Sequence, residues 1–231
     1  MIRKMKPTLR IDVLSLFPKT LEGFVSESIL AKAIDSGLIE VNSFDLRRWA
    51  KGKHRETDDR PFGGGAGMVM KPEPLFAAVN EIANDNTTII YMAPDGEKLN
   101  TSICQELSIK RHILLISGHY EGVDQRVRDY LVNREISVGD YVLTNGTLSS
   151  SILIDAVCRH VPGVLGDKES LNDETFEEGL LGIPQYTRPS EFNGLKVPEV
   201  LLSGNHAEIS AWRRSKRVEK TRKIRPDLLK N

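Results

Sequence analysis

The sequence of 231 residues has few cysteines and no net charge. Only Cys104 and Cys158 are present, and neither belongs to a Cys-x-x-Cys pair. The cysteines therefore predict neither a zinc ribbon nor a disulfide framework, and their apolar surroundings are typical of small buried residues. Basic and acidic residues both number 32, so overall charge gives no argument for binding nucleic acid. Any such argument depends on local charge.

Long hydrophobic runs are also missing. No stretch approaches the roughly 18 apolar residues that a membrane span needs. Residues 1–17 lack the apolar core and small-residue cleavage site of a signal peptide. The chain is 39% hydrophobic and 28% charged, which is typical of a folded globular protein. We therefore expect a soluble, cytoplasmic protein with no membrane partner.

Short apolar runs alternate with segments of helical spacing over residues 1–165. Uninterrupted apolar strands between helices indicate an α/β domain with a parallel sheet. Residues 166–175 are polar and acidic and predict a linker, and 176–231 are expected to form a small helical domain. The predicted strands are 10–16, 39–44, 88–92 and 112–117, with extended segments at 136–138 and 141–143; the predicted helices are 21–36, 72–84, 100–109, 123–132 and 148–160.

Three glycine-bearing turns, 93–96, 118–122 and 139–146, each follow a predicted strand. Ligands of open parallel sheets bind at the carboxyl ends of the strands. The three turns therefore predict one pocket. The apolar side chains of Val138 and of Tyr141 to Leu143 suit packing on the faces of an adenine while backbone groups bond its edge.

The segment 46–67 has no periodicity and ends in the glycine-rich run 63–67. A phosphate-binding P-loop would continue with lysine, but Met68 follows, so nucleoside triphosphate binding is not predicted. Two interpretations stay open. The glycines allow close backbone approach to a bulky ligand, or the segment is a flexible surface loop.

Arg159 and the acidic pair Asp173 and Glu174 are candidates for chemistry, each with a simpler alternative. Arg159 stands near the end of an apolar helix, where a cation offsets the helix dipole. It also stands four residues after Asp155, a spacing that allows an ion pair. Carboxylates in a linker usually only increase solubility.

The C-terminal stretch 213–225 holds eight lysines and arginines and one acid, Glu219. Tyr186 and Trp212 are nearby aromatic residues on which bases could stack. This composition indicates contact with RNA or DNA, and an exposed helix without a partner is the alternative.

Seven segments together carry a family resemblance. They are SLFP (15–18), DDRPFGGGAGMVM (58–70), GHYEGVDQR (118–126), SVGDYVLTNG (137–146), LIDAVCRHVPGVLG (153–166), PQYTRP (184–189) and the SGNH…WRR run (203–214). In this order, and over essentially the whole chain, they resemble the TrmD family, the bacterial tRNA (guanine-N1)-methyltransferases of the SPOUT class.

The resemblance implies a SPOUT domain with a deep trefoil knot that holds the methyl donor S-adenosylmethionine, and a helical C-terminal domain. It implies a homodimer with active sites shared between subunits. The implied substrate is tRNA, methylated on N1 of the guanosine immediately 3′ of the anticodon. The family suggests Mg²⁺ dependence, although no residues in this sequence spell out a metal site.

Site residues follow from the matching motifs. Arg159 is the expected catalytic arginine, and an ungapped count places the catalytic carboxylate on Glu174, with Asp173 as the alternative. The expected donor-binding residues are Pro94, Gly118, Tyr120, Glu121, Gly122, Val138, Gly139, Asp140, Tyr141, Val142, Leu143 and Gly146. The expected tRNA-binding residues are Asp58, Arg60, Gly63, Gly64, Gly65, Tyr186, Arg188, His206, Trp212, Arg213 and Arg214.

The sequence departs from the family where the usual Gly-Gly-Glu is Asn145, Gly146 and Thr147. Asparagine tolerates positive φ, so the turn is expected to survive, while the lost carboxylate bears on the placement of donor or substrate. Three other functions stay open: a SPOUT methyltransferase acting at another RNA position, an RNA-binding protein that has lost catalysis, and a structural protein.

Overall fold

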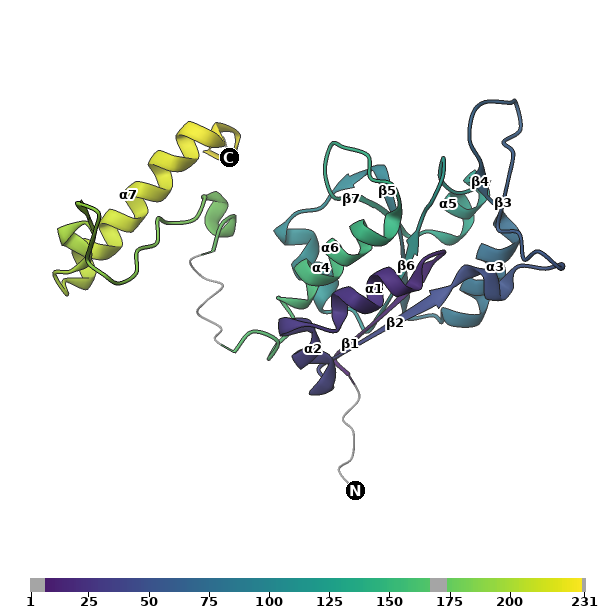
Figure 1. The fold of residues 1–231 in the computed structure, drawn as a ribbon, viewed down its shortest axis with the longest axis horizontal. Helices are drawn as coiled ribbons and strands as arrows, with labels where there is room; N and C mark the ends of the chain where they lie inside the picture. The colour runs from purple at the N-terminus through teal and green to yellow at the C-terminus, as the bar shows by residue number, and fades with distance from the viewer. Residues whose placement is uncertain (1–6, 167–173, 230–231) are drawn as a thin grey trace, which may run out of the picture. The chain divides into compact units, whose positions relative to one another are not determined.

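The computed structural model describes residues 7–166 and 174–229. The chain divides after Gly166 into two compact units (Figure 1). The first unit contains β1 (Leu9–Ser15), α1 (Pro18–Val25), α2 (Ser28–Asp35), β2 (Ile39–Asp45), the 3-10 helix η1 (Leu46–Trp49), β3 (Asp58–Asp59), β4 (Val69–Met70), α3 (Pro72–Ile82), β5 (Thr87–Lys98), α4 (Thr101–Ser108), β6 (His112–Ser117), α5 (Gln125–Leu131), β7 (Arg134–Ser137) and α6 (Gly146–Cys158).

A five-stranded sheet forms the centre of the first unit, in the order β2-β1-β6-β5-β7. Every pairing is parallel. All six residues of β6 are buried, as expected for a central strand covered on both faces. The prediction of an α/β fold on a parallel sheet is therefore confirmed.

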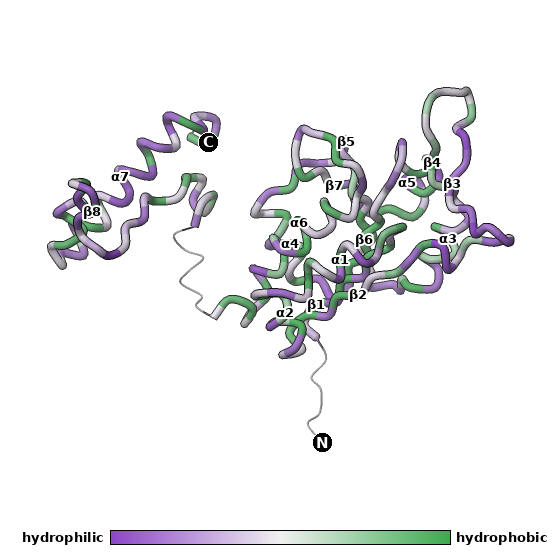
Figure 2. The backbone as a smooth tube through the Cα atoms, viewed as in Figure 1, coloured by the Kyte–Doolittle hydropathy of each residue, from purple (hydrophilic) through white to green (hydrophobic). Residues whose placement is uncertain are grey.

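Helices cover both faces of the sheet. Leu21, Leu107 and Leu153 place α1, α4 and α6 in one hydrophobic core, which α2 joins. Leu75 and Val127 place α3 and α5 in the core on the other face. Figure 2 shows hydrophobic segments running through the middle of this unit. Burial of these side chains is the main term that stabilises the layered arrangement.

The predicted helix over 21–36 is wrong in one respect, because the structure has two helices there. Ser26 ends α1, and its hydroxyl donates to the Gly23 carbonyl oxygen at 3.0 Å. Ser28 then begins α2 with a φ of 59°. Serine hydroxyls compete for backbone hydrogen bonds and so break a helix that periodicity alone continues.

Two predicted local structures at the strand ends are also corrected. The predicted turn 93–96 lies within β5, where the pairing with β7 shifts register between Met92 and Glu97. The predicted extended segment 141–143 is not a strand. The Tyr141 amide donates to the Gly139 carbonyl at 2.8 Å, and this tight turn directs the chain out of the sheet.

The second unit contains η3 (Glu177–Gly179), β8 (Glu191–Phe192), β9 (Leu195–Lys196), η4 (Glu199–Leu201), α7 (His206–Ile224) and η5 (Pro226–Leu229). The expected helical character is found in α7, whereas residues 183–189 have no regular secondary structure and β8 pairs with β9 as a hairpin. Pro184, Pro189 and Pro198 explain this, because proline lacks the amide that a helix interior needs.

Two buried polar residues of α7 attach the preceding chain to the helix. The Leu181 amide donates to Thr221 Oγ1 at 2.9 Å, and Arg217 Nε donates to the Leu181 carbonyl at 3.2 Å. Arg217 is thus a structural member of the basic stretch.

Candidate active site

A cavity of about 390 Å³ lies at the carboxyl ends of β5, β6 and β7. The three glycine-bearing segments that the sequence predicts to share a pocket all contribute to it. Its lining is Tyr91, Met92, Ala93, Pro94, Asp95, Gly118, His119, Tyr120, Glu121, Gly122, Val123, Arg128, Ile136, Ser137, Val138, Tyr141, Val142, Leu143, Thr144, Asn145, Gly146 and Ser149. The volume is typical of a site for a small molecule.

The buried ring of Tyr91 lies beneath two of the glycines. A Cβ atom at Gly118 would lie 2.9 Å from the Tyr91 hydroxyl, and one at Gly122 would lie 3.2 Å from it. Side chains at these positions would displace the ring, so the glycines are needed for packing as well as for turning. Burial raises the pKa of Tyr91, so this phenol stays protonated at neutral pH.

Arg128 supports the same wall of the cavity, a role that sequence reasoning missed. Its guanidinium lies 5.5 Å from the centroid of the Tyr91 ring. It donates to Asp95 at 2.9 Å and also bonds Glu135 of β7. Arg128 of α5 thus joins the 93–96 segment to β7, and its contact with Asp95 spans 33 positions of the sequence.

The first residue of α6 approaches the end of β6 closely. The Gly146 amide donates to the Gly118 carbonyl at 2.7 Å. A Cβ atom at Gly146 would lie 2.6 Å from the Gly118 nitrogen. Because the neighbouring atoms are backbone, no side-chain rotation relieves that overlap, and only glycine fits.

The two departures from the family pattern both have structural roles at this helix end. Asn145 is extended, with a φ of −164°, so the turn does not use the positive φ that asparagine tolerates. Its side chain instead caps α6 by accepting from the Thr147 amide at 3.0 Å. Thr147 is buried, and its hydroxyl lies 2.7 Å from that of Ser15 at the end of β1.

His119 carries an unsatisfied polar atom in the cavity wall. Within the described residues, its Nδ1 is buried and has no hydrogen-bond partner. The ring lies 5.1 Å from Phe17 and 4.3 Å from Tyr120, in edge-on contacts. Buried polar atoms are usually paired, so a bound ligand is a natural partner for this nitrogen.

The expected donor-binding residues lie around the cavity, except for Gly139 and Asp140. These two belong to the tight turn before Tyr141, and Asp140 pairs with Lys98 at 3.2 Å. Tyr141 and Val142 are 54% and 82% exposed, so part of the apolar wall faces outward.

Arg159, the candidate catalytic arginine, is not part of this lining. Arg159 follows the last residue of α6, whereas Gly146 at the first residue lines the cavity. Arg159 lies about 20 Å by helix rise from Gly146 and about 15 Å from Ser149, the last residue of α6 that lines the cavity. Glu174 belongs to the second unit, where its carbonyl oxygen accepts from Arg217 at 3.4 Å. Asp173 lies outside the described residues.

The predicted tRNA-binding residues of the first unit lie in and beside an exposed loop. Asp58 pairs with Met70 in the short β3–β4 hairpin, and Arg60 is exposed. Gly63, Gly64 and Gly65 have φ values of 84°, 80° and 120°, with open space around each. These three glycines approach no other protein atoms closely, and they therefore fit the interpretation of this segment as a surface loop.

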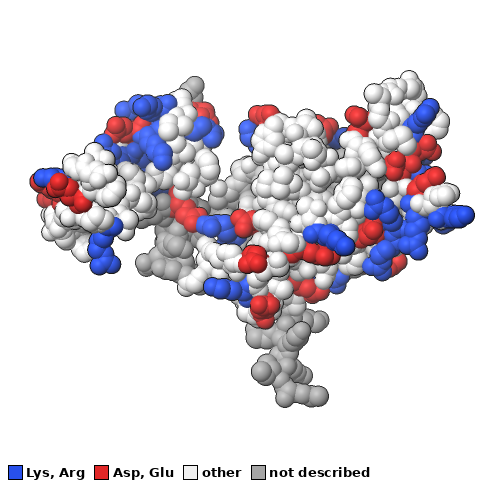
Figure 3. All heavy atoms as spheres, in the orientation of Figure 1, with Lys and Arg blue, Asp and Glu red and all other residues white. Residues whose placement is uncertain are grey.

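Lysine and arginine side chains gather on the side of the first unit that carries α3 and the segment 46–60 (Figure 3). Lys51, Lys53 and Arg55 are all exposed. They add a basic surface to the glycine loop.

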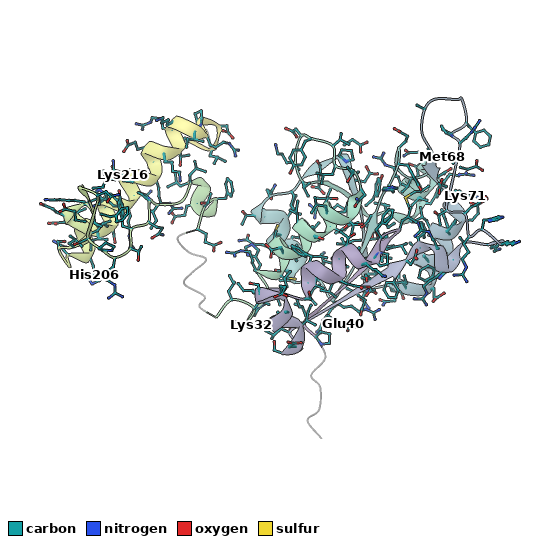
Figure 4. The ribbon with its side chains drawn as sticks, in the orientation of Figure 1. Lys32, Glu40, Met68, Lys71, His206 and Lys216 are labelled. Carbon is teal, nitrogen blue, oxygen red and sulfur yellow. The ribbon has the colours of Figure 1, made fainter. Side chains whose placement is uncertain are left out.

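Three of the six predicted residues of the second unit line a cavity of about 410 Å³. Tyr186, Arg188 and Arg213 line it, and the Trp212 ring lies 6.5 Å from that of Tyr186. Figure 4 shows His206 at the start of α7 and Lys216 on a later turn. Arg214 lies 3.8 Å from Glu178.

Neither a metal-binding cluster nor a membrane-spanning helix is found within residues 7–166 and 174–229. No three histidine, cysteine, aspartate or glutamate side chains there are grouped to hold a metal ion. No helix there combines the length and hydrophobicity needed to cross a bilayer.

Comparison with known proteins gives one consistent result. The family model described as tRNA (Guanine-1)-methyltransferase TrmD matches residues 9–231. A protein of Dictyoglomus turgidum is 51% identical over 96% of this chain and 90% of its own length. One of Moorella thermoacetica is 52% identical, with the same coverage. One of Protochlamydia amoebophila is 48% identical over 95% of this chain and 99% of its own. All three are named tRNA (guanine-N(1)-)-methyltransferase.

Proposed function

The chain belongs to the TrmD family of tRNA (guanine-1)-methyltransferases, and we propose that it transfers a methyl group from S-adenosylmethionine to N1 of a guanosine in tRNA. The proposed target is the guanosine immediately 3′ of the anticodon. The observation that carries the proposal is the cavity at the ends of β5, β6 and β7, built from the segments that match the family.

The cavity residues fit S-adenosylmethionine. Gly118, Gly122 and Gly146 leave backbone close to the cavity, where amides and carbonyls are able to bond the edge of a purine. Pro94 and Leu143 supply apolar surface for its faces. The buried Nδ1 of His119 supplies a polar atom that lacks a protein partner among the described residues. We further propose that the chain is knotted here, as the family resemblance implies.

The proposed chemistry needs a base and a cation. Guanine N1 carries a proton at neutral pH and is a poor nucleophile until that proton is removed. Glu174, or Asp173 in its place, is the proposed general base, a role that typically contributes about 10²- to 10⁴-fold in rate. Arg159 stays protonated and stabilises the negative charge that develops on the guanine ring and its O6. S-adenosylmethionine, when bound, supplies the methyl group on a sulfonium centre.

A homodimer is the proposed active form. Arg159 lies beyond the end of α6 that is remote from the cavity, about 15 Å by helix rise from Ser149, the last cavity-lining residue of the helix. An arginine at that distance cannot contact a base placed at the cavity. We therefore propose that the Arg159 of one protomer serves the cavity of the other.

The proposed tRNA contacts are the exposed glycine loop, the basic segment 46–60 and the basic face of α7. Since tRNA is a cytoplasmic substrate, we propose a cytoplasmic location. The Mg²⁺ requirement that the family resemblance implies stays a prediction.

Methylation of whole tRNA, followed by mass spectrometry of the nucleosides, tests the proposal. We expect 1-methylguanosine, and none when the target guanosine is replaced. A modified nucleoside at another position would favour a different SPOUT methyltransferase. No heat of S-adenosylmethionine binding in calorimetry would favour a non-catalytic RNA-binding protein.

Substitutions test the assigned roles. Arg159→Ala and Glu174→Gln should each lower turnover by about 10²-fold or more while donor binding stays nearly intact. If Asp173→Asn is the inactive variant and Glu174→Gln is active, the base is Asp173. Weak donor binding with normal turnover would contradict the role of Arg159.

A further inference from the structure

The cavity of about 410 Å³ in the second unit has no role in the chemistry described above. It lies between the irregular segment 183–189, the residue after β9, η4 and the start of α7. Its lining is Pro184, Gln185, Tyr186, Thr187, Arg188, Ser190, Val197, Leu201, Leu202, Ile209 and Arg213. All of these residues belong to one compact unit.

The cavity presents apolar and aromatic surface to solvent. Leu202 is 61% exposed and Tyr186 is 50% exposed, while Val197, Leu201 and Ile209 are half-buried. A large aliphatic side chain beside a half-exposed aromatic ring suits a flat ligand that packs between them. Aromatic side chains bind unpaired nucleobases in this way, without strong preference for sequence.

The backbone beside these side chains has unused hydrogen-bonding groups. Among the described residues, none accepts a hydrogen bond from the amides of Gln185, Tyr186, Thr187 or Arg188. The amides of Leu181 and Gly182, just before this segment, are both bonded. Backbone amides and carbonyls without protein partners are able to pair with the donor and acceptor edge of a base.

The cavity is also positively charged. Within the part of the chain that the structure describes, no carboxylate lies within 4 Å of Arg188 or Arg213. The other cations of α7 are partly neutralised, because Arg214 and Arg217 approach Glu178 and Lys216 pairs with Glu219. The two arginines of the cavity therefore favour an anion such as a phosphodiester.

We propose that this cavity binds a single unpaired nucleotide of the tRNA, other than the target guanosine. The base lies against Tyr186 and Leu202, and a neighbouring phosphate lies at Arg188 and Arg213. This inference rests on the proposed function, because it takes tRNA as the substrate. It gives the second unit a specific contact in addition to the general attraction of the basic helix.

Trp212 provides a direct test, since its ring lies 6.5 Å from that of Tyr186. In full-length Trp49→Phe protein, Trp212 is the only tryptophan. Titration with a single-stranded RNA trinucleotide, without methyl donor, should change its fluorescence to saturation. Tyr186→Ala or Arg213→Gln in this background should weaken binding by about tenfold or more, whereas Tyr186→Phe, which keeps the ring, should restore it.

The matched control is Lys220→Gln, which removes a charge from α7 outside the cavity and should weaken binding by only about twofold at the same salt concentration. The proposal is overturned if the trinucleotide leaves Trp212 fluorescence unchanged, or if Tyr186→Ala weakens binding no more than Lys220→Gln does. It is also overturned if guanosine monophosphate binds as tightly as the trinucleotide, because the cavity would then be a site for free nucleotides.

The KM for tRNA separates this inference from the proposed function. If the protein forms 1-methylguanosine but Tyr186→Ala leaves the KM unchanged, only the nucleotide site is wrong. If Trp212 responds to RNA as expected but no methyl transfer occurs, the proposed function is wrong and the nucleotide site stands.

Discussion

At the scale of single residues, a charged group is buried inside the parallel sheet. The Asp12 side chain has no exposed surface. It accepts from Arg10 at 2.7 Å, from Asn42 at 2.9 Å, and lies 3.0 Å from His112 Nε2. Burial alone would raise the pKa of Asp12, but the hydrogen bonds from His112, Arg10 and Asn42 outweigh it and lower the pKa below 3.8. The carboxylate is therefore ionised in the folded protein at neutral pH.

Asp12→Asn should lower the free energy of unfolding by about 3 kcal/mol at pH 7, because it leaves the partners of a buried carboxylate without its charge. The pKa of Asp12 is lower in the folded protein than its unfolded value of 3.8. The ionised carboxylate therefore stabilises the folded state fully above pH 3.8, and this stabilisation is lost as the pH falls through the lower pKa of the folded state. The difference between wild type and variant should therefore be constant near neutrality and shrink in acid. Urea unfolding at several pH values measures it. A difference that grows below pH 4 would contradict the assigned charge state.

The two cysteines should be unreactive in the folded protein. Burial raises the pKa of Cys158 to about 12, and burial also raises that of Cys104. Since the thiolate is the reactive form, neither side chain is prepared for nucleophilic chemistry. Iodoacetamide at pH 8 should leave both thiols free and methyl transfer unchanged, with full labelling after denaturation, as mass spectrometry would show. Loss of activity on labelling one native cysteine would refute this.

At the scale of elements, the start of α6 is the critical junction of the first unit. Asn145 caps the helix, Thr147 bonds Ser15 of β1, and Ser150 bonds Ser117 of β6 at 2.7 Å. The helix end is thus tied to two central strands by side-chain hydrogen bonds that satisfy buried hydroxyls. The glycine between the cap and Thr147 sets how closely the helix approaches them.

Gly146→Ala should destabilise the protein by about 1–3 kcal/mol, since the added methyl would overlap the backbone of Gly118 and Ser117. It should also weaken S-adenosylmethionine binding, because the same displacement opens the cavity wall. Urea unfolding and calorimetry measure the two effects. Gly23→Ala in α1 is the matched control. It adds the same methyl in open space and should be neutral or stabilising. Equal behaviour of the two variants would contradict the packing argument.

At the scale of the whole molecule, the proposed site needs two chains. The first turn of α6 lines the cavity, whereas Arg159 follows the last residue of the helix. A rigid helix holds these two features apart in every copy. In a dimer with two-fold symmetry, the Arg159 of each protomer is able to lie beside the cavity of the other. Such a dimer would have two equivalent shared sites.

Mixing two variants that are each impaired in a different part of the site tests this arrangement. Arg159→Ala lacks the arginine and Gly146→Ala lacks a sound cavity, so each homodimer should have no intact site. After unfolding and refolding together in equal amounts, about one quarter of the wild-type activity should return, because half the dimers are mixed and each has one intact site. The same proteins refolded separately and then combined serve as the control. Absence of recovery would mean that each chain holds a complete site.

The sequence by itself determined the elements and the family. Apolar runs such as 112–117 and the helical spacing of 72–84 depend on neighbours along the chain, and both segments are found essentially where predicted. The motifs also identify the segments that line the cavity, because turns follow strands in a parallel sheet. Local competition for backbone hydrogen bonds explains why the single helix predicted over 21–36 is wrong, because the Ser26 hydroxyl bonds the backbone where α1 ends.

Only the tertiary structure decided which distant groups meet. The contact of Gly146 with Gly118, the support of Tyr91 by Arg128 and the cavity of the second unit all join segments separated along the chain. The separation of Arg159 from the cavity likewise became visible only once both ends of α6 were placed. The physical reason is that periodicity records which face of an element is buried, whereas the identity of the atoms packed against that face depends on the path of the whole chain.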